Sequence, residues 1–400
     1  MKIFVIGMWH LGCVNAVGLQ KLGHKVTCFD FDLNTLYKLK HGIMPIHESG
    51  IKKEFAKGKI KCVDDIKYAK NKDFIFITYD IGANNVTLDI IDRIIDEIKP
   101  FINRKQIIVV RSQVTIGVCE KIAKETGCKV CYMPENLRLG TALKDFFNPG
   151  WLVFGLSDIS LKPRIQKLFS KIKAKKIFLG LKEAEMVKLT MNGYLATLIS
   201  FSGEISNICE YYNINAQDVF STVKLDKRIS PFAPINPGLG FSGGTIDRDL
   251  KSLILLRPAT RVLPAVRMFN EERKYYVLDK LTSLLGTLNN KTIVFLGVTY
   301  KKDTDTLRNS PVVPLVNEMK NFYVTIKAYD PLVKSGIDNV QFVDLKDIKD
   351  ADAIVVMTDY DEFKKLDFSK FNVVIDTKNV VPKSVKHYGV GVNYRWKKKQ

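Results

Sequence analysis

The chain has 400 residues, of which 46% are hydrophobic and 26% are charged, and its formal net charge is +20. This composition is typical of a soluble globular protein with two or three domains, and no apolar run reaches the ~18 residues that a membrane span requires. The basic residues are spread along the chain without interleaved aromatic side chains, so we expect neither a nucleic-acid partner nor membrane insertion. We expect most of the positive charge to lie on solvated faces, with the attraction of an anionic substrate such as a nucleotide diphosphate as the alternative.

The first apolar stretch, "MKIFVIGMWHLG", is interrupted at His10 and is typical of a first strand that enters a turn rather than of a signal peptide. We therefore expect a cytoplasmic protein. The N-terminal part of the chain then alternates short β-branched runs with amphipathic segments, which predicts a parallel sheet with crossover helices. The runs are residues 2–7, 25–30, 73–78, 106–112, 129–135 and 151–155.

The sequence "VIGMWHLG" follows the first predicted strand and opens a helix, as a dinucleotide-binding fingerprint does. The fingerprint G-x-G-x-x-G is only partly present: Gly7 and Gly12 are kept, but Trp9 stands where the pyrophosphate normally approaches the backbone. Asp30 ends the second predicted strand about 20 residues later, where a carboxylate binds ribose hydroxyls and repels a 2′-phosphate. This pattern predicts NAD as the cofactor, with a Rossmann-like domain without cofactor as the alternative. The residues expected at the cofactor are Gly7, Trp9, His10, Leu11, Gly12 and Asp30.

Strand patterns are absent from residues 182–285. Residues 183–212 have apolar side chains at helical spacing and predict one long helix, and a glycine- and proline-rich loop at residues 230–244 follows it. A long apolar helix between two domains is typical of a subunit interface, so we expect a homodimer through this region.

Strand patterns return in the last part of the chain, at residues 291–297, 324–330, 351–359 and 372–379. They predict a second, smaller sheet with helices. The expected fold class is therefore α/β, with two Rossmann-like parallel-sheet domains joined by a long central helical region.

Six segments fall in the order and spacing of the UDP-glucose/GDP-mannose dehydrogenase family, which the chain resembles over essentially its whole length. They are "GHKVTCFDFD", "PENLRLGTALKDFFNPGWLVFG", "EMVKLTMNGYLATLISFSGE", "RISPFAPINPGLGFSGGTIDRDL", "GVTYKKDTDTLRNSP" and "VIDTKN". The resemblance implies an NAD-binding domain at residues 1–181, a helical dimerisation region with a glycine-rich substrate loop at 182–285, and a nucleotide-sugar-binding domain at 286–400. Members of the family oxidise the C6 hydroxyl of a sugar to a carboxylate in two NAD-dependent steps. A cysteine carries the intermediate as a thiohemiacetal and then as a thioester.

The position of the family's cysteine is Thr245 in this chain, and no cysteine follows Cys209. A thiol, with a reference pKa of ~8.5, is readily activated, whereas a threonine hydroxyl needs a dedicated base and would form a less reactive ester. We therefore expect NAD-dependent oxidation of a nucleotide-diphosphate sugar that stops after one two-electron step, at an aldehyde or ketone. Two alternatives stay open. One is a four-electron oxidation of C6 to a uronic acid through the aldehyde hydrate, without a thioester; the other is a non-catalytic nucleotide-sugar-binding protein.

The resemblance also implies catalytic roles for four other residues. Lys188 and Asn192, spaced i, i+4 on the long helix, match a pair that stabilises oxyanion charge. Asp249 matches an aspartate that helps to activate water, and Glu135 matches a glutamate of water-assisted proton transfer. Each role has a structural alternative: Lys188 could be a solvated helix residue, Asp249 a helix cap and Glu135 a loop anchor.

Further residues match binding positions of the family. The implied cofactor contacts are Ser112, Gln113 and Arg308, and the implied substrate contacts are Asn136, Leu137, Arg138, Arg228, Gly240, Phe241, Gly243 and Lys301. Arg228 matches an arginine that reaches the sugar of the neighbouring subunit, while Arg308 could equally form a structural ion pair with Asp305. The chain departs from the family near the chemistry at Gln113, Thr115, Asn136 and Leu139, which favours an altered reaction or an altered sugar.

The seven cysteines show neither metal-ligand nor disulfide spacing. Cys128 and Cys131 form a C-x-x-C pair, but no second pair follows it. We therefore expect no metal site.

Overall fold

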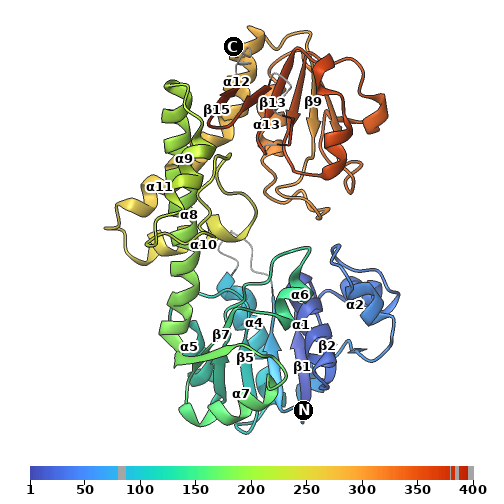
Figure 1. The fold of residues 1–400 in the computed structure, drawn as a ribbon. Helices are drawn as coiled ribbons and strands as arrows, with labels where there is room; N and C mark the ends of the chain where they lie inside the picture. The colour runs from blue at the N-terminus through green and yellow to red at the C-terminus, as the bar shows by residue number, and fades with distance from the viewer. Residues whose placement is uncertain (80–86, 379, 383–386, 395–400) are drawn as a thin grey trace. The chain divides into compact units, whose positions relative to one another are not determined.

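The computed structural model describes residues 1–79, 87–378, 380–382 and 387–394. The chain forms two compact units, Met1–Thr190 and Met191–Gln400, and each is described by itself. Figure 1 shows the fold, with many of the helices and strands labelled.

Within the described residues, the N-terminal unit contains an eight-stranded sheet in the order β3-β2-β1-β4-β5-β6-β7-β8. The strands are β1 (Lys2–Ile6), β2 (Lys25–Phe29), β3 (Lys61–Cys62), β4 (Phe74–Ile77), β5 (Ile107–Val110), β6 (Lys129–Tyr132), β7 (Trp151–Leu156) and β8 (Lys175–Gly180). The strands pair in parallel, except that β7 runs antiparallel to β6. The parallel sheet predicted from the β-branched runs is thus present, with one reversal between β6 and β7.

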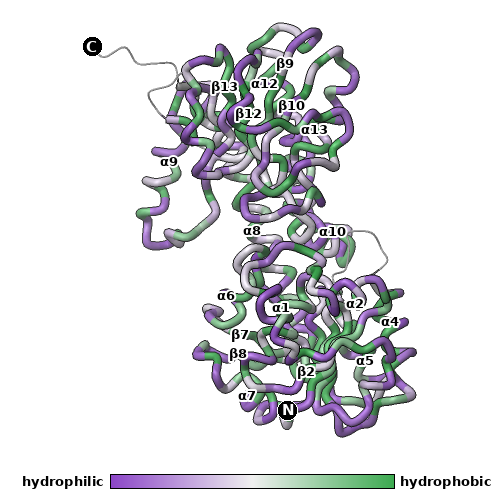
Figure 2. The backbone as a smooth tube through the Cα atoms, turned by 90° about the vertical axis from the view of Figure 1, so that its right-hand side faces the viewer, coloured by the Kyte–Doolittle hydropathy of each residue, from purple (hydrophilic) through white to green (hydrophobic). Residues whose placement is uncertain are grey.

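Helices cover both faces of this sheet. They are α1 (His10–Lys21), α2 (Leu33–Lys40), α3 (Ile51–Phe55), α4 (Thr87–Ile98), α5 (Val118–Thr126), α6 (Ala142–Phe147), α7 (Lys162–Leu168) and the start of α8 (Leu181–Tyr211), with short 3-10 segments η1 (Ile66–Ala69), η2 (Lys99–Phe101) and η3 (Ile159–Leu161). Alternate residues of β1 point to opposite faces. Val5 therefore packs in the cluster that contains α1 and α6, and Phe4 in the cluster that contains α4, α5 and the start of α8. Figure 2 shows the strands near β2 mostly in green, as expected for strands buried on both faces.

The strand order of the N-terminal sheet reverses between β1 and β4. Ligands of open α/β sheets bind outside the carboxyl ends of the strands at such a reversal. Asp30 and Thr78 directly follow β2 and β4, and Ser112 lies two residues after the end of β5, so the topology brings these residues to the same edge of the sheet.

The C-terminal unit holds a seven-stranded sheet among the described residues, in the order β11-β10-β9-β12-β13-β14-β15. The strands are β9 (Thr292–Leu296), β10 (Thr325–Tyr329), β11 (Gln341–Phe342), β12 (Ala353–Val356), β13 (Val373–Asp376), β14 (His387–Gly389) and β15 (Val392–Tyr394), of which only β14 and β15 pair antiparallel. The helices of this unit are the rest of α8, α9 (Ala216–Val223), α10 (Thr245–Leu256), α11 (Val262–Glu272), α12 (Tyr276–Leu285) and α13 (Val312–Met319), with 3-10 segments η4 (Arg273–Tyr275), η5 (Leu345–Asp347), η6 (Asp361–Lys365) and η7 (Phe368–Lys370).

The predicted fold class is confirmed: two largely parallel α/β sheets occur with a long helix between them in the sequence. The helix predicted at residues 183–212 is α8 (Leu181–Tyr211), and the division between the compact units falls within it. The three-domain division at residues 1–181, 182–285 and 286–400 stays a prediction. In the described part of the chain, none of the helices combines the length and the apolar character needed to cross a membrane.

Candidate active site

The turn between β1 and α1 has the geometry that a dinucleotide-binding turn requires. Gly7 has φ +94°, and a Cβ on Gly12 would lie 1.8 Å from the Gly7 carbonyl oxygen, so both positions require glycine. Trp9 is different: its φ of −83° and ψ of −156° are extended backbone that any residue adopts. The turn can therefore form with tryptophan at the middle position of the fingerprint.

Asp30 is fixed at the carboxyl end of β2. Its side chain is buried and accepts hydrogen bonds from the Met8 amide at 2.5 Å and from the Tyr79 hydroxyl at 2.7 Å. Burial, together with the neighbouring charge of Asp30, raises the pKa of Tyr79, so this hydroxyl stays a donor at neutral pH. Tyr79 was not predicted from the sequence. Its position just after β4, next to the strand that carries the glycine turn, is the signal that could have indicated it.

Unpartnered polar atoms lie at the carboxyl end of β5. Ser112 Oγ and Gln113 Nε2 are buried, and neither has a hydrogen-bond partner in the described part of the chain. Arg111, just before them, is also buried, and burial lowers its pKa to about 10. Buried polar atoms are nearly always hydrogen-bonded, so Ser112 and Gln113 fit a polar ligand that is absent from the structure.

Taken together, these residues fit a nicotinamide dinucleotide. Asp30 presents a carboxylate for a ribose, the N-terminus of α1 presents backbone amides for a pyrophosphate, and the unpartnered atoms of Ser112 and Gln113 supply polar contacts. The predicted contacts His10 and Leu11 form the first turn of α1.

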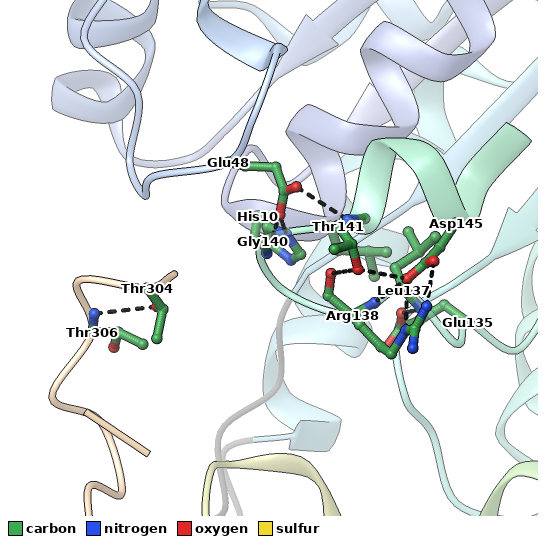
Figure 3. Close-up of polar contacts among 12 residues, drawn as sticks. His10, Glu48, Glu135, Leu137, Arg138, Gly140, Thr141, Asp145, Thr304 and Thr306 are labelled. Carbon is green, nitrogen blue, oxygen red and sulfur yellow. Dashed lines mark hydrogen bonds and ion pairs between the residues drawn. The ribbon is translucent and has the colours of Figure 1, made fainter. Parts of the chain in front are cut away.

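The loop between β6 and α6 carries Glu135 and the predicted substrate residues. One oxygen of Glu135 accepts the Leu137 amide at 2.8 Å, so the carboxylate also shapes its own loop. Arg138 donates to both oxygens of Asp145, at 3.0 and 2.8 Å, and its side chain is 75% exposed (Figure 3). Asn136 is exposed and accepts a hydrogen bond from Lys188.

Lys188 is a buried cation on α8. Its side chain is 4% exposed, and Nζ donates to Asn136 Oδ1 at 3.3 Å. No carboxylate lies within 4.0 Å of this ammonium among the described residues. The buried Glu185, one turn earlier, accepts the amides of Gly117 and Cys119 and so anchors this part of α8 to the start of α5. Lys188 is therefore not a solvated helix residue. Because a buried charge without a counter-charge is costly, its position favours the binding of an anionic or partly negative ligand atom.

In the C-terminal unit, a buried polar cluster forms around Asp249. Asn192 Nδ2 donates to Asp249 Oδ2 at 2.5 Å, and Arg248 Nε pairs with Oδ1 at 3.0 Å. Asp249 has no exposed surface and lies within α10, so it is not a helix cap. Thr245 is the first residue of α10 and lies four residues before Asp249, which places both on one face of the helix.

The glycine-rich loop before α10 is held from several sides. Gly240 and Gly243 both have φ +84°, a conformation that favours glycine. The Phe241 amide donates to Asn270 Oδ1 at 2.7 Å, and Asn270 Nδ2 donates back to the Phe241 carbonyl at 3.0 Å. Arg273 Nε donates to the Gly238 carbonyl at 3.2 Å. Side chains of Asn270 and Arg273 therefore hold the backbone of this loop by hydrogen bonds.

A cavity of about 360 Å³ lies beside this loop, within the C-terminal unit. Loop residues 239–243 line it together with Asn270 and Arg273, Tyr300, and the start of α13. Lys301 Nζ lies 5.8 Å from the centre of the Tyr300 ring. The Arg308 guanidinium lies close to Gly244, with Nε 3.5 Å from where a Cβ on that glycine would stand. The remaining predicted residue, Arg228, is paired with Asp226 and its side chain is 89% exposed.

None of the seven cysteines has the features of an activated nucleophile. All are free thiols, and burial raises the pKa of every one of them above the ordinary value of 9.0. Cys209 is the one cysteine of the C-terminal unit that holds Thr245, and it is buried. No group of three metal-binding side chains occurs in the described ranges.

Models of one protein family match three consecutive segments of the chain. The NAD binding domain of the UDP-glucose/GDP-mannose dehydrogenase family matches residues 1–173, its central domain residues 182–272, and its UDP binding domain residues 294–383. The UDP-glucose 6-dehydrogenase of Rickettsia conorii is 31% identical over 98% of this chain and 99% of its own length. The chain belongs to the UDP-glucose/GDP-mannose dehydrogenase family.

Other members of the UDP-glucose/GDP-mannose dehydrogenase family are similar to the chain over nearly its whole length. The UDP-glucose 6-dehydrogenase YwqF of Bacillus subtilis is 30% identical over 94% of this chain and 92% of its own length. Among solved structures, a UDP-glucose dehydrogenase from Pyrobaculum islandicum has a TM-score of 0.89 with 26% identity, covering 98% of both chains. A UDP-D-ManNAc dehydrogenase from Pyrococcus horikoshii has a TM-score of 0.87 with 23% identity, covering 98% and 99%, and shows the fold alone.

Membership of the family confirms three predictions made from the sequence. The chain is an NAD-dependent nucleotide-sugar dehydrogenase, its cofactor is NAD, and its substrate is a nucleotide sugar. The cavity beside the glycine-rich loop is lined by residues of the central and UDP binding segments. The roles of individual site residues and the effect of Thr245 stay predictions.

Proposed function

We propose that this enzyme removes one hydride from a nucleotide-diphosphate sugar and releases an aldehyde or ketone. The observation that carries the proposal is Thr245 at the start of α10, in a chain whose seven cysteines are free thiols with raised pKa, six of them buried and Cys62 half-buried. A second oxidation through an acyl-enzyme needs a nucleophile that forms a reactive thioester, and a threonine hydroxyl cannot supply one.

Within this proposal, the residues of the chain handle the proton and the charge at the sugar oxygen. The bound NAD supplies the hydride acceptor. Glu135 takes the hydroxyl proton through a water molecule, and the Lys188 ammonium stabilises the negative charge that develops on the oxygen. Asn192, four residues further along α8, keeps its assigned role as a neutral hydrogen-bond donor. Lys188 is buried and its ammonium donates to the neutral Asn136 side chain, with no carboxylate within 4.0 Å among the described residues, which supports this role.

The four-electron route through the aldehyde hydrate is the main rival. It requires a group that activates water, and Asp249 is the residue assigned to that task. Both oxygens of Asp249 are already engaged, one by Asn192 and one by Arg248. This arrangement weakens Asp249 as a base and supports the single-step reaction.

The remaining residues keep their assigned roles as part of the proposal. The cofactor contacts are Gly7, Trp9, His10, Leu11, Gly12, Asp30, Ser112, Gln113 and Arg308, and the substrate contacts are Asn136, Leu137, Arg138, Arg228, Gly240, Phe241, Gly243 and Lys301. The fixed glycine-rich loop and its cavity support the placement of the sugar diphosphate there.

We also propose that the enzyme is a homodimer through α8. Tyr194, Phe201 and Ile208 recur every seven residues, which places them on one face of the helix, and their side chains are 62%, 52% and 52% exposed. Large aromatic and apolar side chains exposed in a row on one helix mark an interaction surface. Leu255, Val262 and Met268 add exposed apolar surface on α10 and α11.

The proposal is tested by incubating the purified enzyme with NAD and a panel of UDP-, GDP- and CDP-sugars. We expect NADH with at least one sugar and a carbonyl compound as the product. Calorimetric binding of a sugar nucleotide without any NADH formation, and without NAD binding, would instead favour a non-catalytic binding protein.

A further inference from the structure

Glu48 is a buried carboxylate that sequence reasoning did not identify. It lies in the loop between α2 and α3 and is 7% exposed. Its side chain contacts two segments that are distant in sequence: the first turn of α1 and the end of the loop that precedes α6 (Figure 3).

Both oxygens of Glu48 are used in these contacts. Oε2 lies 2.8 Å from His10 Nε2 and accepts the Gly140 amide at 2.7 Å, while Oε1 accepts the Ala142 amide at 3.0 Å. Hydrogen bonds to an ionised carboxylate are roughly twice as strong as neutral ones. A single buried side chain therefore fixes three groups at once.

The two segments that Glu48 joins have different tasks. His10 is the first residue of α1 and follows the glycine turn of the NAD-binding fingerprint. Gly140 and Ala142 flank Thr141, the N-cap of α6, at the end of the loop that carries Glu135 and Arg138. The carboxylate thus connects a cofactor-binding turn to a substrate-binding loop inside the N-terminal unit.

We propose that Glu48 is a positioning residue that couples the cofactor turn to the substrate loop. Any movement of the first turn of α1 is transmitted through His10 and Glu48 to residues 140–142, so NAD binding sets the position of the loop that holds Glu135. The inference rests on the proposed function, because it assumes that the loop contacts a nucleotide sugar. By thermodynamic linkage, each ligand then changes the affinity for the other by the same factor.

The test compares Glu48→Gln with a matched control, Glu54→Gln. Glu54 is 9% exposed and lies on α3, where it pairs with Lys21 and Lys57 and touches neither segment. The amide of Glu48→Gln keeps only one acceptor oxygen and carries no negative charge, so it weakens all three contacts and leaves at least one partner unpaired.

The first readout is hydrogen exchange of the ligand-free protein. We expect Glu48→Gln to lose protection both in the first turn of α1 and at residues 140–142, whereas Glu54→Gln keeps it in both. Loss in only one of the two segments, or the same pattern in both variants, would overturn the coupling. This readout does not depend on activity.

The second readout is calorimetric affinity for NAD with and without saturating UDP-glucose. NADH replaces NAD in this titration, because it occupies the cofactor site without accepting a hydride and so prevents turnover. We expect cofactor and sugar to change each other's affinity by roughly fivefold or more in the wild type and in Glu54→Gln, and not at all in Glu48→Gln. His10→Phe breaks the link between Glu48 and the cofactor turn. Because His10 is also an assigned cofactor contact, only the ratio of cofactor affinities with and without UDP-glucose is compared; this ratio should fall to one while residues 140–142 keep their protection. Coupling that survives in His10→Phe contradicts the inference. A wild type that binds neither ligand contradicts the proposed function instead, and hydrogen exchange still decides the role of Glu48.

Discussion

At the scale of single residues, the extent of the oxidation depends on which residue stands at the start of α10. Thr245 occupies a helix N-terminus whose N-cap is Gly244, so no side chain caps the first amides of the helix. The position therefore suits an anionic or polar ligand atom, but its hydroxyl lacks the acidity of a thiol. A cysteine at this position would restore the thiol.

Thr245→Cys should add a second oxidation. At the N-terminus of a helix, the pKa of the new thiol is lowered, so it can attack the aldehyde formed in the first step. We expect the yield of NADH per sugar to rise from one towards two, as measured by absorbance with limiting sugar. Thr245→Ser is the control and should stay at one. If both the cysteine and the serine variants gave two NADH per sugar, the residue at position 245 would not determine the number of oxidation steps.

Lys188→Met should reduce catalysis without weakening the fold. The variant removes the charge but keeps a long apolar stem, so we expect kcat to fall roughly 10²–10³-fold while the Kd for NAD is unchanged. Because the buried ammonium has no carboxylate partner among the described residues, its removal should leave Tm equal or higher. Steady-state kinetics and thermal unfolding test both points. A lower Tm with unchanged kcat would make Lys188 structural.

Thiol reagents should leave the enzyme active. Burial raises the pKa of Cys119 and Cys209, so neither is a thiolate at pH 8 in the folded state. In the unfolded chain these thiols ionise near the ordinary pKa of 9.0, whereas in the folded protein they stay protonated. The free energy of unfolding therefore falls as the pH rises above 9.0. Iodoacetamide at pH 8 should label the seven cysteines only after unfolding in urea. Inactivation that parallels the labelling of one thiol would contradict this expectation.

Residue patterns in the sequence identified part of the site and missed another part. Asp30 and the glycines at 7 and 12 could be predicted because a known turn geometry requires them at a fixed spacing. Glu48 and Tyr79 could not, since each acts through a contact between segments that are distant in sequence. Glu48 lies in a loop without periodicity, and only the fold brings it to His10 and Ala142.

At the scale of elements, α8 was predicted within two residues because apolar side chains at helical spacing run through its whole length. The buried strands were predicted for a similar reason, since both faces of β1, β4 and β5 are covered and the runs are continuous. The reversed strand β7 and the antiparallel pair of β14 and β15 were not, because strand direction leaves no mark on a short apolar run.

The exposed row on α8 yields a prediction for this element. Phe201→Glu places a charge in the centre of the row of Tyr194, Phe201 and Ile208, and burying that charge in a dimer would be costly. We expect sedimentation velocity to show a dimer for the wild type and a monomer for the variant. Tyr323→Glu is the control, because Tyr323 is 86% exposed before β10, away from α8 in the sequence. A variant at 201 that sediments like the wild type would exclude this face as the interface.

At the scale of the whole molecule, the chain keeps all three parts of its family, and the assigned catalytic residues are divided between the two compact units. Lys188 and Glu135 belong to the first, and Thr245 and Asp249 to the second. The family could be predicted from the sequence because its motifs are spread along the entire chain. The sugar and the base could not, because their recognition depends on how loop side chains line the cavity rather than on motif spacing.

We propose above that oxidation by this enzyme stops after one hydride. The most direct measurement is the amount of NADH formed per molecule of limiting nucleotide sugar at completion, with the mass of the product determined on the same sample. We predict one NADH per sugar and a product that has lost two hydrogens, as an aldehyde, its hydrate or a ketone. Two NADH per sugar, together with a uronic acid as the product, would contradict the account.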